Sequence, residues 1–123
     1  MDNFLQKAEN YFILALIAEK IGMRAESATN YFKALSALDD SVLSQKNLKA
    51  KDHSERFLLL KQHFPELYRI TDKLFLVYRR TYTSEITKEE VKLLKENIEN
   101  VFRLYQCKIP TYQEVEKRIR KIS

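Results

Sequence analysis

The chain contains few of the residues that most folds use to turn. It has one glycine and two prolines in 123 residues. β-Sandwiches and Rossmann domains need more glycine, because their tight turns require backbone conformations that other residues avoid. Lys, Glu, Leu and Ala, which favour helices, are abundant. The composition therefore predicts long helices joined by few turns.

Cysteine and histidine are scarce as well. Cys107 is the single cysteine and cannot form an internal disulfide, and the only histidines are His53 and His63. Structural zinc sites usually take four Cys or His ligands, so we expect no metal site and no other cofactor.

Long apolar runs are also missing. None approaches the roughly 20 residues that span a bilayer. The first ten residues, MDNFLQKAEN, lack the basic and then apolar order of a signal peptide. We therefore expect a cytoplasmic protein that does not associate with membranes.

The positive charge is unevenly distributed. The net charge is +5, and the segment from Arg103 onward contains six basic and two acidic residues. A basic end attracts nucleic acid or an acidic partner. A solubilising terminal helix with a mixed-charge face is the alternative explanation.

Apolar residues recur three or four positions apart in most of the chain, which predicts helices with an apolar stripe on one side. The stripe positions include Phe12, Phe57, Leu60, Phe64, Leu94, Val115, Ile119 and Ile122. A first helix is capped by Asp2 or Asn3 and ends at Gly22, where a left-handed residue is expected. A second helix follows at once, so the two must form an antiparallel hairpin. Tyr11 and Tyr31, together with Phe32, are predicted to lie in the core.

Helix-start and helix-stop signals divide the remainder. Capping boxes are predicted at Asp52-x-x-Glu55, Thr87-x-x-Glu90 and Thr111-x-x-Glu114, and breaks at 46–51, at Pro65 and at 83–86. We predict one all-α domain over residues 1–123. Its architecture is an up-down four-helix bundle with a short extra helix in the middle and a short C-terminal helix.

The first hairpin carries small and aromatic residues in a pattern shared with two kinds of helical protein. It looks like a tetratricopeptide hairpin, but only one copy is visible, and a solenoid needs about three repeats. The hairpin more closely resembles that of prokaryotic HEPN-like helical bundles, and a later segment, YRRTYTSEITKEEVKLLKENIENVF, resembles theirs too. The resemblance spans Phe4 to Tyr105, and its hairpin residues are Ala8, Tyr11, Ala15, Ala28, Tyr31, Phe32, Lys33, Ala34 and Leu35.

This resemblance implies a bundle that often dimerises and binds RNA or nucleotides, or pairs with a nucleotidyltransferase partner. Catalytic members carry an Arg with a His five to seven positions after it, at the start of the later helix. That place corresponds here to Arg79 and Arg80, but residues 84–87 are Ser-Glu-Ile-Thr, with no histidine. We therefore assign no catalytic residue and expect no ribonuclease activity of the family type.

A literal Arg/His match lies elsewhere, in KDHSERFLLLKQHF, where Arg56 and His63 are seven positions apart. Seven residues are about two helical turns, so the two side chains would share a face about 10 Å apart along the axis. His53 lies near the same stripe. These three residues are candidates for a phosphate- or RNA-binding edge, for a metal-independent ribonuclease site, or for ordinary polar positions flanking a buried face.

Arg79, Arg80 and Tyr82 form a second candidate binding group. Paired exposed arginines beside a tyrosine can bind phosphate and stack on a base. Salt bridges to Glu85 or Glu89 are the alternative. The sequence favours a non-catalytic module that binds RNA, a nucleotide or a partner protein, and the alternative is a structural bundle that dimerises without binding nucleic acid.

Overall fold

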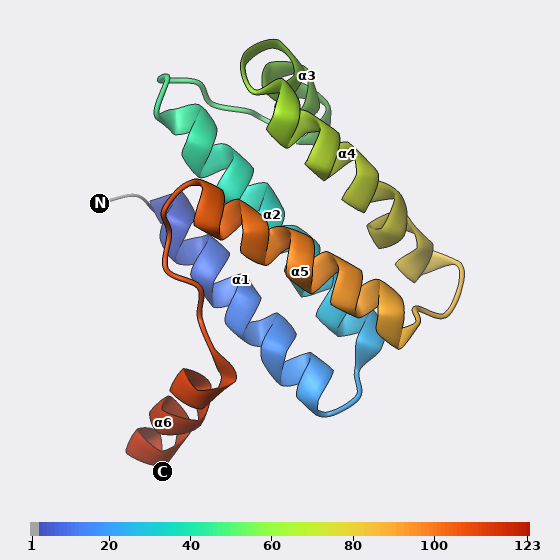
Figure 1. Ribbon diagram of the computed structural model, residues 1–123, viewed down its shortest axis with the longest axis vertical. Helices are drawn as coiled ribbons and strands as arrows, with labels where there is room; N and C mark the ends of the chain where they lie inside the picture. Colours follow the sequence, from blue (N-terminus) through green and yellow to red (C-terminus); the bar gives the residue numbers. More distant parts are fainter. Residues whose placement is uncertain (1–2) are drawn as a thin grey trace.

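The computed structural model describes residues 3–123, and these residues are helical with no strand (Figure 1). The all-α prediction is therefore confirmed. The helices are α1 (Asn3–Lys20), α2 (Arg24–Ser44), α3 (His53–His63), α4 (Pro65–Arg79), the 3₁₀ turn η1 (Arg80–Tyr82), α5 (Lys88–Leu104) and α6 (Tyr112–Ile122). Helix α2 is central, since it contacts α1, α3, α4 and α5.

Helices α1 and α2 form the predicted antiparallel hairpin. Gly22 adopts φ +83°, a left-handed conformation that costs glycine little. This turn lets the Met23 N–H donate to the Ala18 carbonyl at 2.8 Å. Fully buried alanines such as Ala15 and Ala28 let the two helices approach closely. Close approach also allows the Ser27 hydroxyl to donate to the Ala15 carbonyl at 2.9 Å.

The centre of the core is aromatic. Phe12 of α1 packs edge-on against Tyr31 of α2 and Phe102 of α5, with ring centroids 5.2 and 5.4 Å apart. The buried Tyr31 keeps a partner for its hydroxyl, which donates to Glu19 Oε1 at 2.6 Å. Three helices therefore meet on one phenylalanine ring.

The helix starts follow the sequence signals with one correction. Thr87 and Glu90 form a reciprocal capping box, and the Thr111 side chain accepts from the Glu114 N–H. Asp52 accepts from the Glu55 N–H, but the Glu55 carboxylate turns to the Lys51 N–H, so that box is not reciprocal. Helix α1 begins at Asn3, and Asp2, the other predicted cap, lies outside the described residues.

Pro65 separates α3 from α4, as predicted. Phe64 before it leaves helical geometry at φ −140°, and Pro65 occupies the first turn of α4. The α3 residues predicted to face inward do so unequally: Leu60 is fully buried, whereas Phe57 and Phe64 are half-buried. The hairpin of α3 and α4 thus joins the core through Leu60 of α3 and through Leu67 and Leu74 of α4.

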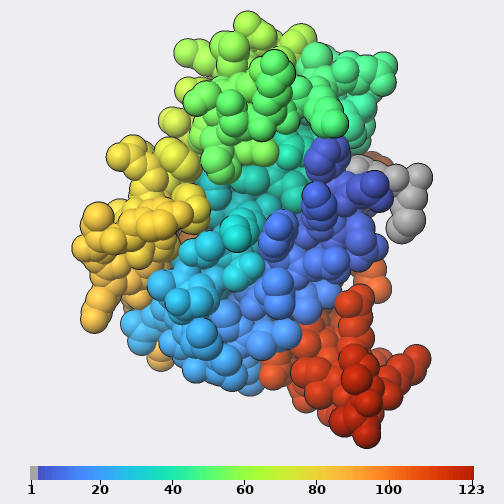
Figure 2. Space-filling model, turned by 180° about the vertical axis from the view of Figure 1, so that it is seen from behind, coloured from blue at the N-terminus to red at the C-terminus, as the bar shows by residue number. Residues whose placement is uncertain are grey.

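Two core predictions were too generous. Tyr11 is half-buried rather than enclosed, because it lines a cavity beside α2. Val115 is the buried residue of α6, while Ile119 and Ile122 are exposed, because α6 lies at the side of the molecule and packs mainly against α1 (Figures 1 and 2). The basic C-terminal helix therefore lies away from α3 and α4.

Replacing Phe12 with alanine should destabilise the fold by about 3–5 kcal/mol, because it empties the contact among α1, α2 and α5. Urea unfolding followed by circular dichroism measures this loss. Leu76, which is 58% exposed on α4, is the control, and its replacement by alanine should cost about 0.5 kcal/mol or less. Equal losses in the two variants would contradict this description of the core.

Candidate functional site

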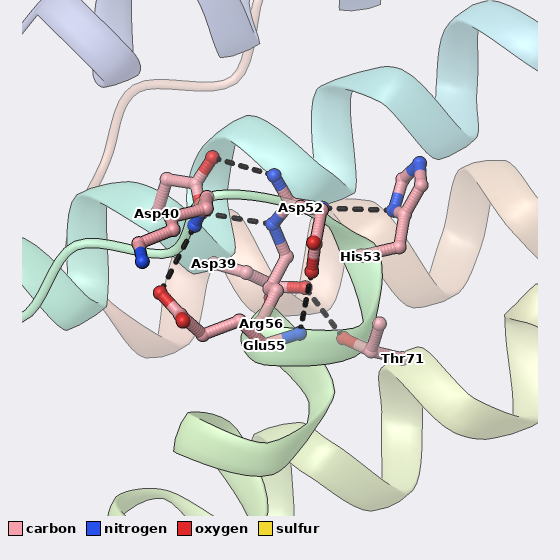
Figure 3. A network of polar contacts seen from close by, with 8 residues as sticks. Asp39, Asp40, Asp52, His53, Glu55, Arg56 and Thr71 are labelled. Carbon is pink, nitrogen blue, oxygen red and sulfur yellow. Dashed lines mark hydrogen bonds and ion pairs between the residues drawn. The ribbon is translucent and has the colours of Figure 1, made fainter.

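Arg56 is bound to Asp40. Its Nε donates to Asp40 Oδ1 at 2.8 Å and its Nη2 to Asp40 Oδ2 at 3.0 Å, and the two side chains are 13% and 14% exposed (Figure 3). This two-point geometry is the strong form of an Arg–carboxylate contact. It attaches α3 to α2. The sequence predicted Arg56 as a possible hydrogen-bond donor to a phosphate group. In the structure, its Nε and Nη2 donate to Asp40 instead.

His53 meets the remaining nitrogen of the same guanidinium. Arg56 Nη1 lies 2.8 Å from His53 Nδ1, and because a guanidinium can only donate, Nδ1 must accept. His53 is then neutral, with its proton on Nε2. Partial burial, followed by the nearby Arg56 charge, lowers the pKa of His53, while Asp40 and Asp52 oppose that shift. The pairing spans three residues, not the seven of the literal motif.

His63 does not join this group. It is the exposed last residue of α3, about two turns from Arg56. No hydrogen bond between His63 and Arg56 occurs in the described part of the chain. The structure therefore brings together His53 and Arg56 and leaves His63 at the other end of the helix.

An aromatic cluster, formed by Phe32, Phe57, Phe75 and Tyr78, lies beside His53. Phe32 and Tyr78 stack nearly parallel, with centroids 4.6 Å apart and planes 8° apart. The His53 ring lies 6.4 Å from both Phe32 and Phe75. The cluster joins α2, α3 and α4. It therefore connects His53 at the start of α3 to Tyr78 near the end of α4.

Arg79 and Tyr82 continue this surface, whereas Arg80 leaves it. The Arg79 guanidinium stands 5.8 Å from the centre of the Phe75 ring. Tyr82 is 74% exposed, and its hydroxyl lies 2.7 Å from that of Tyr78. Burial and this hydrogen bond raise the pKa of Tyr78 to about 12. Arg80 pairs with Glu90 of α5, not with Glu85 or Glu89 as the sequence suggested.

A cavity of about 230 Å³ opens between α1, α2, α3 and the end of α4. On the face in Figure 2, α2 is visible between α1 and the hairpin of α3 and α4. The cavity brings Lys7 of α1 and Lys33 of α2 to the group that contains His53 and Arg56. Its full lining is Phe4, Lys7, Tyr11, Phe32, Lys33, Ser36, Ala37, Asp40, His53, Arg56 and Tyr78. Sequence reasoning missed the two lysines as site residues.

Asp39 lies behind this site and is completely buried. Its Oδ2 accepts from the Thr71 hydroxyl of α4 at 2.8 Å, while Oδ1 has no hydrogen-bond partner among the described residues. Burial raises the pKa of this carboxyl well above its usual range. The bond from Thr71 and the Arg56 charge act in the opposite direction, and Asp40 adds to the rise. Burial therefore favours the neutral form of Asp39, which links α2 to α4 through Thr71.

Within residues 3–123, no helix is long and apolar enough to cross a membrane. In the same residues, no group of three or more His, Cys, Asp or Glu side chains is placed to hold a metal ion. Comparison of the chain with protein families, curated proteins and solved structures finds no match. The chemistry of the site must therefore be argued from its own residues.

Asp39 should make the fold less stable as the pH rises. The folded chain retains a proton on Asp39 that the unfolded chain releases above its ordinary pKa of about 4. Stability is therefore fully present below that value and declines up to the raised pKa of the folded state. The decline attributable to Asp39 should approach, but not exceed, about 1.4 kcal/mol per pH unit.

Chemical unfolding measured from pH 4 to 8 tests this expectation. Asp39→Asn keeps the shape and an acceptor for Thr71 but cannot ionise, so its pH dependence should lack this decline. Exposed Asp72, replaced by Asn, is the matched control on α4 and should leave the decline in place. An Asp39→Asn variant with the same slope as the native chain would show that Asp39 is not held neutral.

Proposed function

We propose that this protein is a non-catalytic binding module for single-stranded RNA or a nucleotide. The observation that carries the proposal is the surface on which exposed His53, Arg79 and Tyr82 lie around the half-buried part of the aromatic cluster. Bases stack on aromatic rings and arginine planes, and positive groups attract the phosphate backbone. Four of the six sequence candidates (His53, Arg56, Arg79 and Tyr82) contribute to this surface or hold it in place.

The state of His53 supports a binding role rather than catalysis. A general base needs a free lone pair, and the lone pair of His53 already accepts from Arg56. Its other nitrogen carries the proton and can donate a hydrogen bond to a ligand. Arg56 is in turn held by Asp40, so it acts by positioning His53 and α3.

We further propose the arrangement of an up-down four-helix bundle for α1, α2, α4 and α5, with α3 inserted and α6 appended. The alternating course of these four helices in Figure 1 supports it. This is the architecture that the HEPN-like resemblance implies. A nucleotidyltransferase partner, which the same resemblance implies, stays a prediction.

Dimerisation through the outer face of α1 is a second candidate function. Asn10, Leu14, Ile17 and Ile21 follow four-three-four spacing on the side opposite the buried Phe12, which is the spacing of a two-helix seam. Leu14 is 49% exposed and Ile21 66%. A second copy of the same helix fits this stripe, because each stripe would cover the apolar residues of the other.

For RNA binding, the affinity of a fluorescent oligouridylate should fall steeply between 50 and 200 mM salt in an anisotropy titration. Tyr82→Ala should cost about 1–3 kcal/mol, the contribution of one base stacked on an aromatic ring. Arg79→Ala should weaken binding, while Arg80→Ala is the matched control, because Arg80 is already paired with Glu90. Absence of binding at low salt would overturn the proposal.

For dimerisation, sedimentation equilibrium should find a dimer of the native chain. The double variant Leu14→Glu/Ile21→Glu should be monomeric, because it places charges in the seam. Leu76→Glu, at a leucine that is 58% exposed on α4, should leave the dimer intact. A native chain that sediments as a monomer at all concentrations would exclude this second function.

A further inference from the structure

The cavity beside Arg56 has more positive charge than its own carboxylate can neutralise. Lys7, Lys33 and Arg56 line it with Asp40, and both Asp40 oxygens are occupied by Arg56. Lys7 and Lys33 are exposed, and the Lys33 ammonium stands 5.8 Å from the centre of the Tyr11 ring. Two lysines from different helices therefore face one opening with no acidic group left free in the lining.

Ser36, one of the lining residues, carries a hydroxyl group for which the described residues supply no partner. The Ser36 hydroxyl oxygen is buried and has no hydrogen-bond partner in the described residues. An unsatisfied buried hydroxyl is costly, and most such groups in proteins have a partner. His53, whose Nε2–H is still available as a donor, lines the same space. The Ser36 hydroxyl and the His53 Nε2–H thus have no hydrogen-bond partner among the described residues, although both side chains belong to the cavity lining.

Aromatic side chains complete the walls. Phe4 and Tyr11 come from α1, and Tyr78 comes from the end of α4, where its other face stacks on Phe32. The volume of about 230 Å³ is below the roughly 300–1,000 Å³ of pockets that enclose drug-sized ligands. It suits one base with its phosphate at the mouth and excludes a dinucleotide.

We infer that this cavity is a subsite for a single nucleotide, with the phosphate between Lys7 and Lys33 and the base beside Tyr11 and Tyr78. This inference rests on the proposed function, because it assigns this cavity as the binding place of one nucleotide, either free or as one unit of an RNA. Arg56 is a positioning residue, since its contacts with Asp40 and His53 hold one wall. Lys7 and Lys33, which were not among the site residues predicted from the sequence, bind the phosphate.

Isothermal titration with uridine 5′-monophosphate tests the subsite directly. The double variant Lys7→Ala/Lys33→Ala should bind it at least about tenfold more weakly, as expected for lost hydrogen bonds to a charged group. Lys73→Ala/Lys117→Ala removes the same charge from exposed positions outside the cavity and should bind normally. Thermal unfolding of both variants establishes that they are folded. Uridine and inorganic phosphate, titrated separately, should each bind more weakly than the nucleotide.

The outcomes separate this inference from the proposed function. Oligouridylate binding without uridine monophosphate binding, or nucleotide binding that the Lys7/Lys33 variant leaves unchanged, would overturn the subsite and leave the RNA module standing. Lysine-dependent nucleotide binding without RNA binding would uphold the subsite and reject RNA as the ligand. A chain that binds neither probe would overturn both.

Discussion

The ion pair between Arg56 and Asp40 is the contact on which the candidate site depends. The ion pair attaches α3 to α2. The remaining nitrogen of Arg56, Nη1, donates to His53 and so makes His53 Nδ1 a hydrogen-bond acceptor. Removing one member would leave the other charge partly buried without a partner, which is the costly way to break such a pair. Asp40 also lies next to Asp39, so loss of Arg56 would remove the cation that opposes the rise in the pKa of Asp39. The same ion pair therefore sets both the position of α3 and His53 and the electrostatic surroundings of Asp39.

The site is formed where polar contacts supplement the apolar core. Helices α1, α2 and α5 meet on the enclosed rings around Phe12, whereas α3 is attached by the buried Leu60, by the half-buried Phe57 against Phe75, and by polar contacts. Hydrogen bonds depend on direction as well as distance. They therefore hold a side chain in one orientation, which apolar packing alone does not require. The cluster of Phe32, Phe75 and Tyr78 carries this order to the exposed Arg79 and Tyr82. The stacked rings of Phe32 and Tyr78 line the cavity, and such a packed aromatic wall suits a flat ligand such as a base.

Local signals predicted the helices well because those signals act within one or two turns. Gly22, Pro65 and the capping threonine Thr87 each end or start a helix through their own backbone preferences, and the structure agrees with all three. The alternation of apolar residues also found Phe12 and Leu94, which are fully buried. It failed in α6, where Ile119 and Ile122 follow the same period but have no facing helix among residues 3–123. Periodicity states which side of a helix is apolar, and burial also requires a neighbour.

The sequence by itself determined that the chain is helical, where its helices start and stop, and which residues carry charge and rings. Only the tertiary structure decided which of them act together. Arg56 pairs with Asp40 sixteen residues earlier, Arg80 pairs with Glu90, and Lys7 of α1 lines the same cavity as Lys33 of α2. Such pairings depend on how far one helix slides and rotates against another, and packing of the whole core sets that, not any local preference.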